Sequence, residues 1–168
     1  TGLFAVGVGA DQKKSDINAL YAFQGGLSLP SKDYYFEEKH AKFREAFLAH
    51  VAKILGLAGA TPEAAAAGAK TILEVETALA TNAKTPVELR DRLANYNKMP
   101  TAELAAKLPA FPFAAYLAER GIGGPAAAEI IVGQPKFFEG VQAQLAARPL
   151  GDWKVYLRYK ILRNAGPY

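Results

Sequence analysis

Two histidines, His40 and His50, are the only imidazole metal-ligand candidates in a chain that has no cysteine. A zinc site built on one helix uses the pattern H-E-x-x-H, which places both imidazoles on one face beside a glutamate that acts as base. His40 and His50 are ten residues apart, so a regular helix points them about 80° away from each other. We interpret both as helix-surface residues and predict that this segment holds no metal and no cofactor.

Motifs for nucleophilic catalysis or phosphate binding are missing from the sequence. There is no G-x-S-x-G, no P-loop and no G-x-G-x-x-G, and the glycines from Gly121 to Gly124 lack the preceding strand that a phosphate loop requires. The absence of cysteine excludes thiolate nucleophiles and disulfides. We therefore predict no catalytic residue in this chain.

Glu76 is the most informative carboxylate. Residues two apart on a helix do not face each other, so Glu74 lies on the outer face, whereas Glu76 projects within about 60° of an apolar stripe. That stripe consists of Ala65, Ala69, Ile72 and Leu79. A carboxylate in such surroundings requires a partner, and we predict a structural ion pair with Arg90 or Arg92 on the next capped segment.

Composition narrows the class of protein. The 168 residues are 51% hydrophobic and 21% charged, with a net charge of +4, which fits one ordinary globular domain. The basic residues are scattered, and a nucleic-acid binder usually gathers them into a stripe. No apolar run approaches the roughly 20 residues that span a bilayer. We expect neither a nucleic-acid partner nor a membrane segment in this chain.

The hydrophobic pattern predicts a mainly α fold: a multi-helix domain with a small N-terminal β-hairpin and one further short strand. Period-two alternation predicts strands over residues 3–9 and 17–23, and Glu129–Val132 is strand-like. Helix starts with capping residues are expected at Thr61, Thr85 and Thr101. Helices are expected at residues 43–55, 61–80, 101–106, 113–119 and 134–145. A further helix is expected to begin at 85, and the last one is expected to carry Trp153 and to stop by Gly166-Pro167.

One segment carries a distinctive signature. Residues 24–35, Gln-Gly-Gly-Leu-Ser-Leu-Pro-Ser-Lys-Asp-Tyr-Tyr, resemble the Q-G-G-L-G-L-P-x-x-D-Y-Y motif of the neprilysin and endothelin-converting-enzyme family of zinc metallopeptidases. Collinear blocks at 73–80 (L-E-x-E-T-x-L-A) and 153–158 (W-K-x-Y-L-R) are similar to the same family. Ser28 replaces the usual glycine, which we expect to affect only local turn geometry. Gln24, Gly25 and Gly26, which open the signature, are expected to be structural.

The resemblance implies several properties of a parent protein, the longer peptidase of which this segment would be a part. Members of this family are extracytoplasmic zinc endopeptidases or oligopeptidases that cleave small peptides, and their zinc ligands lie in a C-terminal catalytic domain. The helical N-terminal domain faces that domain across a closed cavity and limits access to peptides. None of the zinc ligands maps onto this sequence, so residues 1–168 are expected to be a single partial domain, a fragment of the lid.

Two functions follow. The first is a substrate-gating, cavity-forming segment whose partners are its own C-terminal catalytic domain and peptide substrates. The alternative is a stand-alone helical protein-interaction module without peptidase activity. The gene sequence downstream of Tyr168 distinguishes them, because H-E-x-x-H there supports the first function and a stop codon supports the second.

Overall fold

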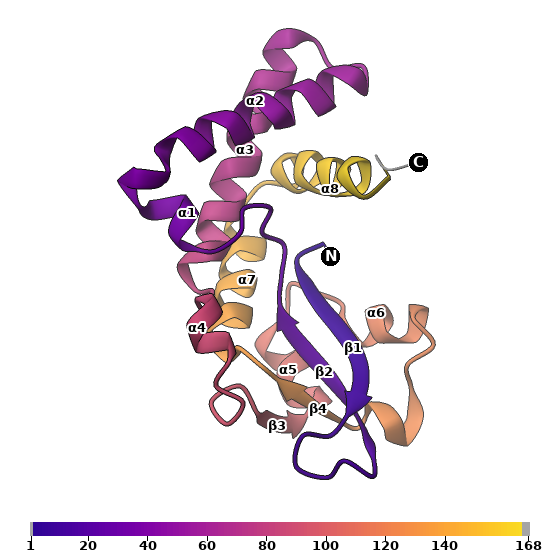
Figure 1. The fold of residues 1–168 in the computed structure, drawn as a ribbon. Helices are drawn as coiled ribbons and strands as arrows, with labels where there is room; N and C mark the ends of the chain where they lie inside the picture. The colour runs from indigo at the N-terminus through magenta and orange to yellow at the C-terminus, as the bar shows by residue number, and fades with distance from the viewer. Residues whose placement is uncertain (1, 166–168) are drawn as a thin grey trace.

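The computed structural model describes residues 2–165, which form a mainly helical domain with a small sheet (Figure 1). The strands are β1 (Phe4–Ala10), β2 (Asn18–Gln24), β3 (Asn97–Pro100) and β4 (Glu129–Val132). The helices are α1 (Asp33–Phe36), α2 (Ala41–Leu57), α3 (Pro62–Thr81), α4 (Pro86–Leu89), α5 (Thr101–Lys107), α6 (Phe113–Glu119), α7 (Pro135–Ala147) and α8 (Leu150–Ala165), with 3-10 turns at Glu38–His40 and Gly124–Ala127. The predicted fold class is confirmed.

The sheet has the strand order β1-β2-β4-β3. β1 pairs antiparallel with β2, as the sequence predicts for a hairpin, and β2 pairs in parallel with β4 through Leu20, Tyr21 and Ala22. The further strand at Glu129–Val132 is therefore confirmed. β3, which pairs antiparallel with β4, was not predicted, because its four residues Asn-Lys-Met-Pro are too short and too polar to show alternation.

The Tyr21 side chain of β2 lies beside β1 and reaches the hairpin loop. Gly7 lies directly opposite Tyr21, and a Cβ on Gly9 would lie 3.9 Å from the Tyr21 ring. The Tyr21 hydroxyl donates a hydrogen bond to the Ala10 carbonyl at 2.8 Å and accepts one from the Gln12 amide at 3.1 Å. This side chain therefore fixes the start of the hairpin loop.

Helix α3 is the centre of the helical part and packs on α2, α7 and α8 (Figure 1). Thr61 caps it as predicted, because its side chain accepts a hydrogen bond from the Ala64 amide. Thr85 forms the predicted capping box with Glu88, although α4 is only one turn long. Both caps are local interactions between residues three apart, which is why the sequence reveals them.

The predicted cap at Thr101 is wrong. Pro100 occupies the N-cap position of α5, and no side-chain cap is formed there. The Thr101 amide instead donates to the Ala128 carbonyl at 2.9 Å, which extends the pairing of β3 with β4 and makes Thr101 the first helical residue. The predicted stop of the last helix at Gly166-Pro167 lies outside the described residues, and α8 is assigned through Ala165.

Aromatic packing joins the sheet to the helices. The Phe4 ring on β1 contacts Phe111, Phe113, Tyr116 and Phe138, with ring centroids 5.0 to 6.1 Å apart. Edge-to-face and tilted pairs of this kind add to the free energy of simple apolar burial. The start of β1 is thus anchored on α6 and α7.

Candidate functional site

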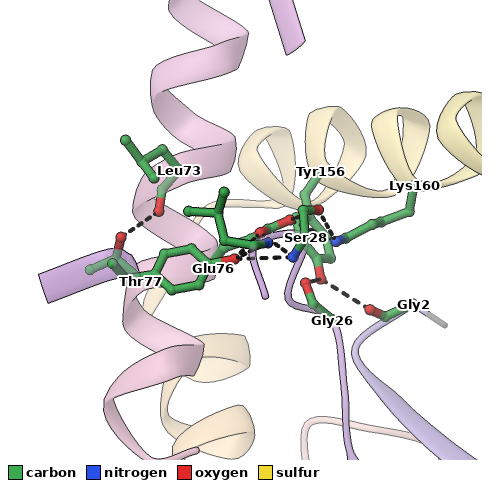
Figure 2. A network of polar contacts seen from close by, with 10 residues as sticks. Gly2, Gly26, Ser28, Leu73, Glu76, Thr77, Tyr156 and Lys160 are labelled. Atoms are coloured by element: carbon green, nitrogen blue, oxygen red, sulfur yellow. Dashed lines mark hydrogen bonds and ion pairs between the residues drawn. The ribbon is translucent and has the colours of Figure 1, made fainter. Parts of the chain in front are cut away.

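The carboxylate of Glu76 lies at the centre of a buried polar network (Figure 2). Its Oε1 accepts hydrogen bonds from Lys160 Nζ at 2.6 Å and from Ser28 Oγ at 2.7 Å. Its Oε2 accepts from the Tyr35 hydroxyl at 2.6 Å and from the Ser28 amide at 2.7 Å. Both oxygens are therefore fully engaged, which is what a carboxylate with 0% exposure requires.

The network joins segments that are far apart in the sequence. Glu76 belongs to α3, Tyr35 to α1 and Lys160 to α8, while Ser28 lies in the loop between β2 and α1. The Tyr35 hydroxyl also accepts a hydrogen bond from the Leu29 amide at 3.0 Å. Three helices thus meet at one carboxylate together with residues 25–32, the part of the signature motif between β2 and α1, which we call the signature loop.

Burial sets the protonation behaviour of the groups around Glu76. Desolvation lowers the pKa of Lys160, and the nearby Glu76 carboxylate opposes that shift. Burial, followed by the charge of Glu76, raises the pKa of Tyr35 well above its ordinary value of 10.0. Tyr35 therefore stays a hydrogen-bond donor across the physiological range.

The contact between Ser28 and Lys160 resembles the start of a serine-lysine nucleophile pair, with 2.8 Å between Oγ and Nζ. In this network, however, the ammonium donates to the hydroxyl and the hydroxyl donates to Glu76. The side chain of Lys160 is only 6% exposed, and its ammonium donates to both Ser28 and Glu76, so it does not act as a base toward the Ser28 hydroxyl in this arrangement. The arrangement joins α3, α8 and the loop between β2 and α1 through hydrogen bonds and an ion pair.

The signature loop is fixed at several further points. The Tyr156 hydroxyl lies 2.7 Å from the Gly26 carbonyl, to which it donates, and 3.0 Å from the Gly2 carbonyl (Figure 2). Gly26 has φ +76°, and a Cβ there would lie 2.6 Å from the Tyr156 hydroxyl oxygen. A Cβ on Gly25 would lie 3.1 Å from the Cα of Phe4. Both glycines are needed for this close approach.

Gln24 links the end of β2 to the segment that follows α3. Its side-chain amide donates to the Lys84 carbonyl at 3.0 Å and accepts from the Lys84 amide at 2.7 Å. Its own backbone amide donates to Gln134 Oε1 at 2.8 Å. The side chain therefore pairs with main chain much as a neighbouring strand would.

The predicted partners of Glu76 are wrong. Arg90 and Arg92 are both exposed, and Arg90 is the C-cap residue of α4. Because α4 is a single turn, the segment after Thr85 does not run back along α3, and the cation that reaches Glu76 comes from α8. The prediction of a buried Glu76 with a cation beside it is otherwise consistent with the geometry, and Glu74 is exposed as expected.

Sequence reasoning missed Lys160 and the role of Ser28. Trp153, Tyr156 and Lys160 are spaced three and four residues apart, so Lys160 lies on the buried face of α8. This spacing was the available signal for a buried lysine. The replacement of glycine by Ser28 does more than alter a turn, because its hydroxyl bridges Glu76 and Lys160.

The histidines are well separated in the structure. His40 stacks on Tyr34, with ring centroids 3.9 Å apart, and His50 is exposed on α2. Across residues 2–165, no three histidine, cysteine, aspartate or glutamate side chains converge on a point where a metal could be held. None of the described helices is long and apolar enough to cross a bilayer.

The fold and the network define a mainly helical segment that is held together by a buried structural clamp. Residues 1–168 match the model of peptidase family M13 over their whole length. The chain therefore belongs to peptidase family M13, in the N-terminal region of that family.

Individual relatives agree with this assignment. Endothelin-converting enzyme 1 of Homo sapiens is 36% identical over 118 residues, which cover 68% of this chain and 15% of that protein. Zinc metalloprotease Zmp1 of Mycobacterium tuberculosis, in its open state, superposes with a TM-score of 0.89 and 29% identity over 95% of this chain and 25% of its own. PepO of Lactobacillus rhamnosis shares the fold, with a TM-score of 0.80 at 16% identity.

The chain spans 15% of the length of this curated relative and about a quarter of these solved structures. Activity, substrates and partners belong to those longer proteins.

Proposed function

We propose that this chain is a substrate-gating, cavity-forming segment of a zinc metallopeptidase that cleaves small peptides. The observation that carries the proposal is the family match across residues 1–168, together with the close superposition on a zinc metalloprotease. Zinc and the catalytic groups reside in a separate catalytic domain of the parent, which is the partner of this segment. The parent acts outside the cytoplasm.

The buried network supports such a role physically. A wall that excludes folded proteins must keep its shape, and Glu76 ties α1, α3, α8 and the signature loop to one another. Buried polar groups that are fully hydrogen-bonded favour a single arrangement of the elements they join. We infer that the clamp keeps the position of the wall fixed relative to the catalytic domain.

Two measurements test this proposal. The gene should continue beyond Tyr168 into a segment that contains H-E-x-x-H, and a stop codon there would instead favour a stand-alone interaction module. The isolated chain, purified without chelators, should carry no stoichiometric zinc and hydrolyse no quenched peptide, because a catalytic zinc site needs about three protein ligands. One tightly bound zinc with peptide turnover would overturn the proposal.

A further inference from the structure

β1 is an edge strand with an open side. It has one neighbour, β2, so the N–H and C=O groups of alternate residues point away from the sheet. Among the described residues, the main chain of residues 4–9 hydrogen-bonds only to β2. The strand Phe-Ala-Val-Gly-Val-Gly-Ala has neither a charge nor a proline, the usual means of blocking a free edge. Within residues 2–165, no segment pairs with this side of β1, which leaves its main-chain groups available to an extended strand.

An apolar groove lies beside the first half of this edge. Its volume is about 460 Å³, and residues 2–6 line one side. Because these residues are consecutive, main chain as well as side chains faces the groove. The other side consists of Phe111, which precedes α6, Tyr116 of α6 and Leu157 of α8. The groove can therefore take an apolar side chain while the edge of β1 pairs with main chain.

Arg120 supplies the polar contact. Among the described residues that line the groove, it alone carries a charge. Its guanidinium lies 5.3 Å from the Tyr116 ring centroid and donates to the Tyr116 hydroxyl at 3.1 Å. That contact holds the side chain at the groove and leaves further N–H donors, whose fork geometry suits a carboxylate.

We propose that the free edge of β1 and this groove bind the C-terminal end of an extended peptide. The peptide main chain pairs antiparallel with β1, an apolar side chain enters the groove, and the terminal carboxylate binds Arg120. The direction follows from the geometry, since the C-terminal end of an antiparallel strand lies beside the N-terminal end of β1, where the groove is. The proposal rests on the proposed function only for the source of the peptide, a substrate of the parent.

A second copy of the chain fits this site less well. If β1 of another molecule paired antiparallel with this edge, its end, Ala10 followed by Asp11, would lie near Arg120. Asp11 is 1% exposed, and its carboxylate accepts hydrogen bonds from the Lys13 amide at 2.8 Å and the Tyr96 hydroxyl at 3.0 Å. It is therefore committed to its own hairpin loop, whereas a peptide terminus brings a carboxylate of its own.

The test uses the 168-residue chain and two probes that differ by one group. An N-acetylated pentapeptide of alternating threonine and valine, ending in leucine, is titrated as the free acid and as the C-terminal amide while backbone amide shifts are followed by NMR. We expect shifts in β1 and an affinity about three- to fivefold higher for the acid. Arg120→Gln should remove that preference, and Arg92→Gln, an exposed arginine elsewhere, should keep it.

N-methylation of alternate peptide residues tests the strand pairing without changing the protein. Methyl groups on the amides that face β1 should abolish binding, whereas methyl groups on the other set should be tolerated. The proposal would be overturned by equal binding of acid and amide or by equal effects of both methylation patterns. It would also be overturned if the amide shifts in β1 appeared only when the chain dimerises. Because the assay needs no catalytic domain, its failure is distinct from a failure of the proposed function, which the gene continuation decides.

Discussion

Replacing Glu76 with glutamine changes one of the two acceptor oxygens into an NH2 group. Each oxygen accepts two hydrogen bonds, so whichever way the amide turns, two donors lose their acceptor. One of the two is a hydroxyl, which can turn to accept from the NH2 group, but the other, the Lys160 ammonium or the Ser28 amide, faces a donor. Lys160 also becomes a buried cation without its counter-ion. Hydrogen bonds to charged groups contribute about 1.5–3 kcal/mol each, and breaking a buried ion pair costs about 3–5 kcal/mol. We expect Glu76→Gln to lose about 3–5 kcal/mol of unfolding free energy.

The loss should be measured by urea denaturation and by thermal unfolding at neutral pH. For a domain of this size, 1 kcal/mol lowers Tm by about 2–4 °C, so the expected shift is about 6–20 °C. Glu74→Gln is the matched control, because Glu74 is on the same helix and exposed; its effect should stay within about 0.5 kcal/mol. A similar loss in both variants would refute the clamp.

A double-mutant cycle with Lys160→Met sharpens the same test. Removing both charges leaves no uncompensated buried ion, and paired replacements of this kind often recover stability. The double variant should therefore lose less free energy than the sum of the two single variants, by about 0.5–3 kcal/mol. Additive losses would mean that Glu76 and Lys160 act independently despite their 2.6 Å contact.

Three further outcomes are expected. Because burial raises the pKa of Tyr35 and Tyr156, the unfolded chain releases these protons first. Unfolding free energy should therefore fall as the pH rises above about 10, the pKa of an unfolded tyrosine, by up to about 1.4 kcal/mol per pH unit for each tyrosine. Tyr35→Phe should reduce this slope, measured by urea titrations at a series of pH values. Gly26→Ala should cost about 2–4 kcal/mol in the same assay, because φ is +76° and the new Cβ meets the Tyr156 hydroxyl; no loss would mean that the loop relaxes freely. Gln24→Ala should lower the unfolding free energy by about 1–3 kcal/mol, because it removes two hydrogen bonds to the Lys84 main chain. Arg90→Ala, at an exposed position, should change the unfolding free energy by no more than about 0.5 kcal/mol.

Features that depend on neighbouring residues were readable from the sequence. The caps at Thr61 and Thr85 involve partners three residues away, and the predicted helix at 113–119 matches α6, which is followed by Gly121 with φ +69°. The hairpin of β1 and β2 and the strand β4 follow from hydrophobic alternation and from an apolar run. Helical geometry alone placed Glu76 on the buried side of α3.

Contacts between distant segments were decided only by the tertiary structure. The parallel pairing of β2 with β4 joins residues about 110 apart, and Lys160 reaches Glu76 across 84 residues. Nothing in the local sequence of Glu76 states which cation will lie near it, so the prediction of Arg90 or Arg92, the arginines nearest in sequence, is wrong. Ser28 and Lys160 became partners because α3, α8 and the signature loop pack against one another. A single sequence records the preference of each element for burial, whereas the partner of a buried charge depends on how the elements are arranged in space.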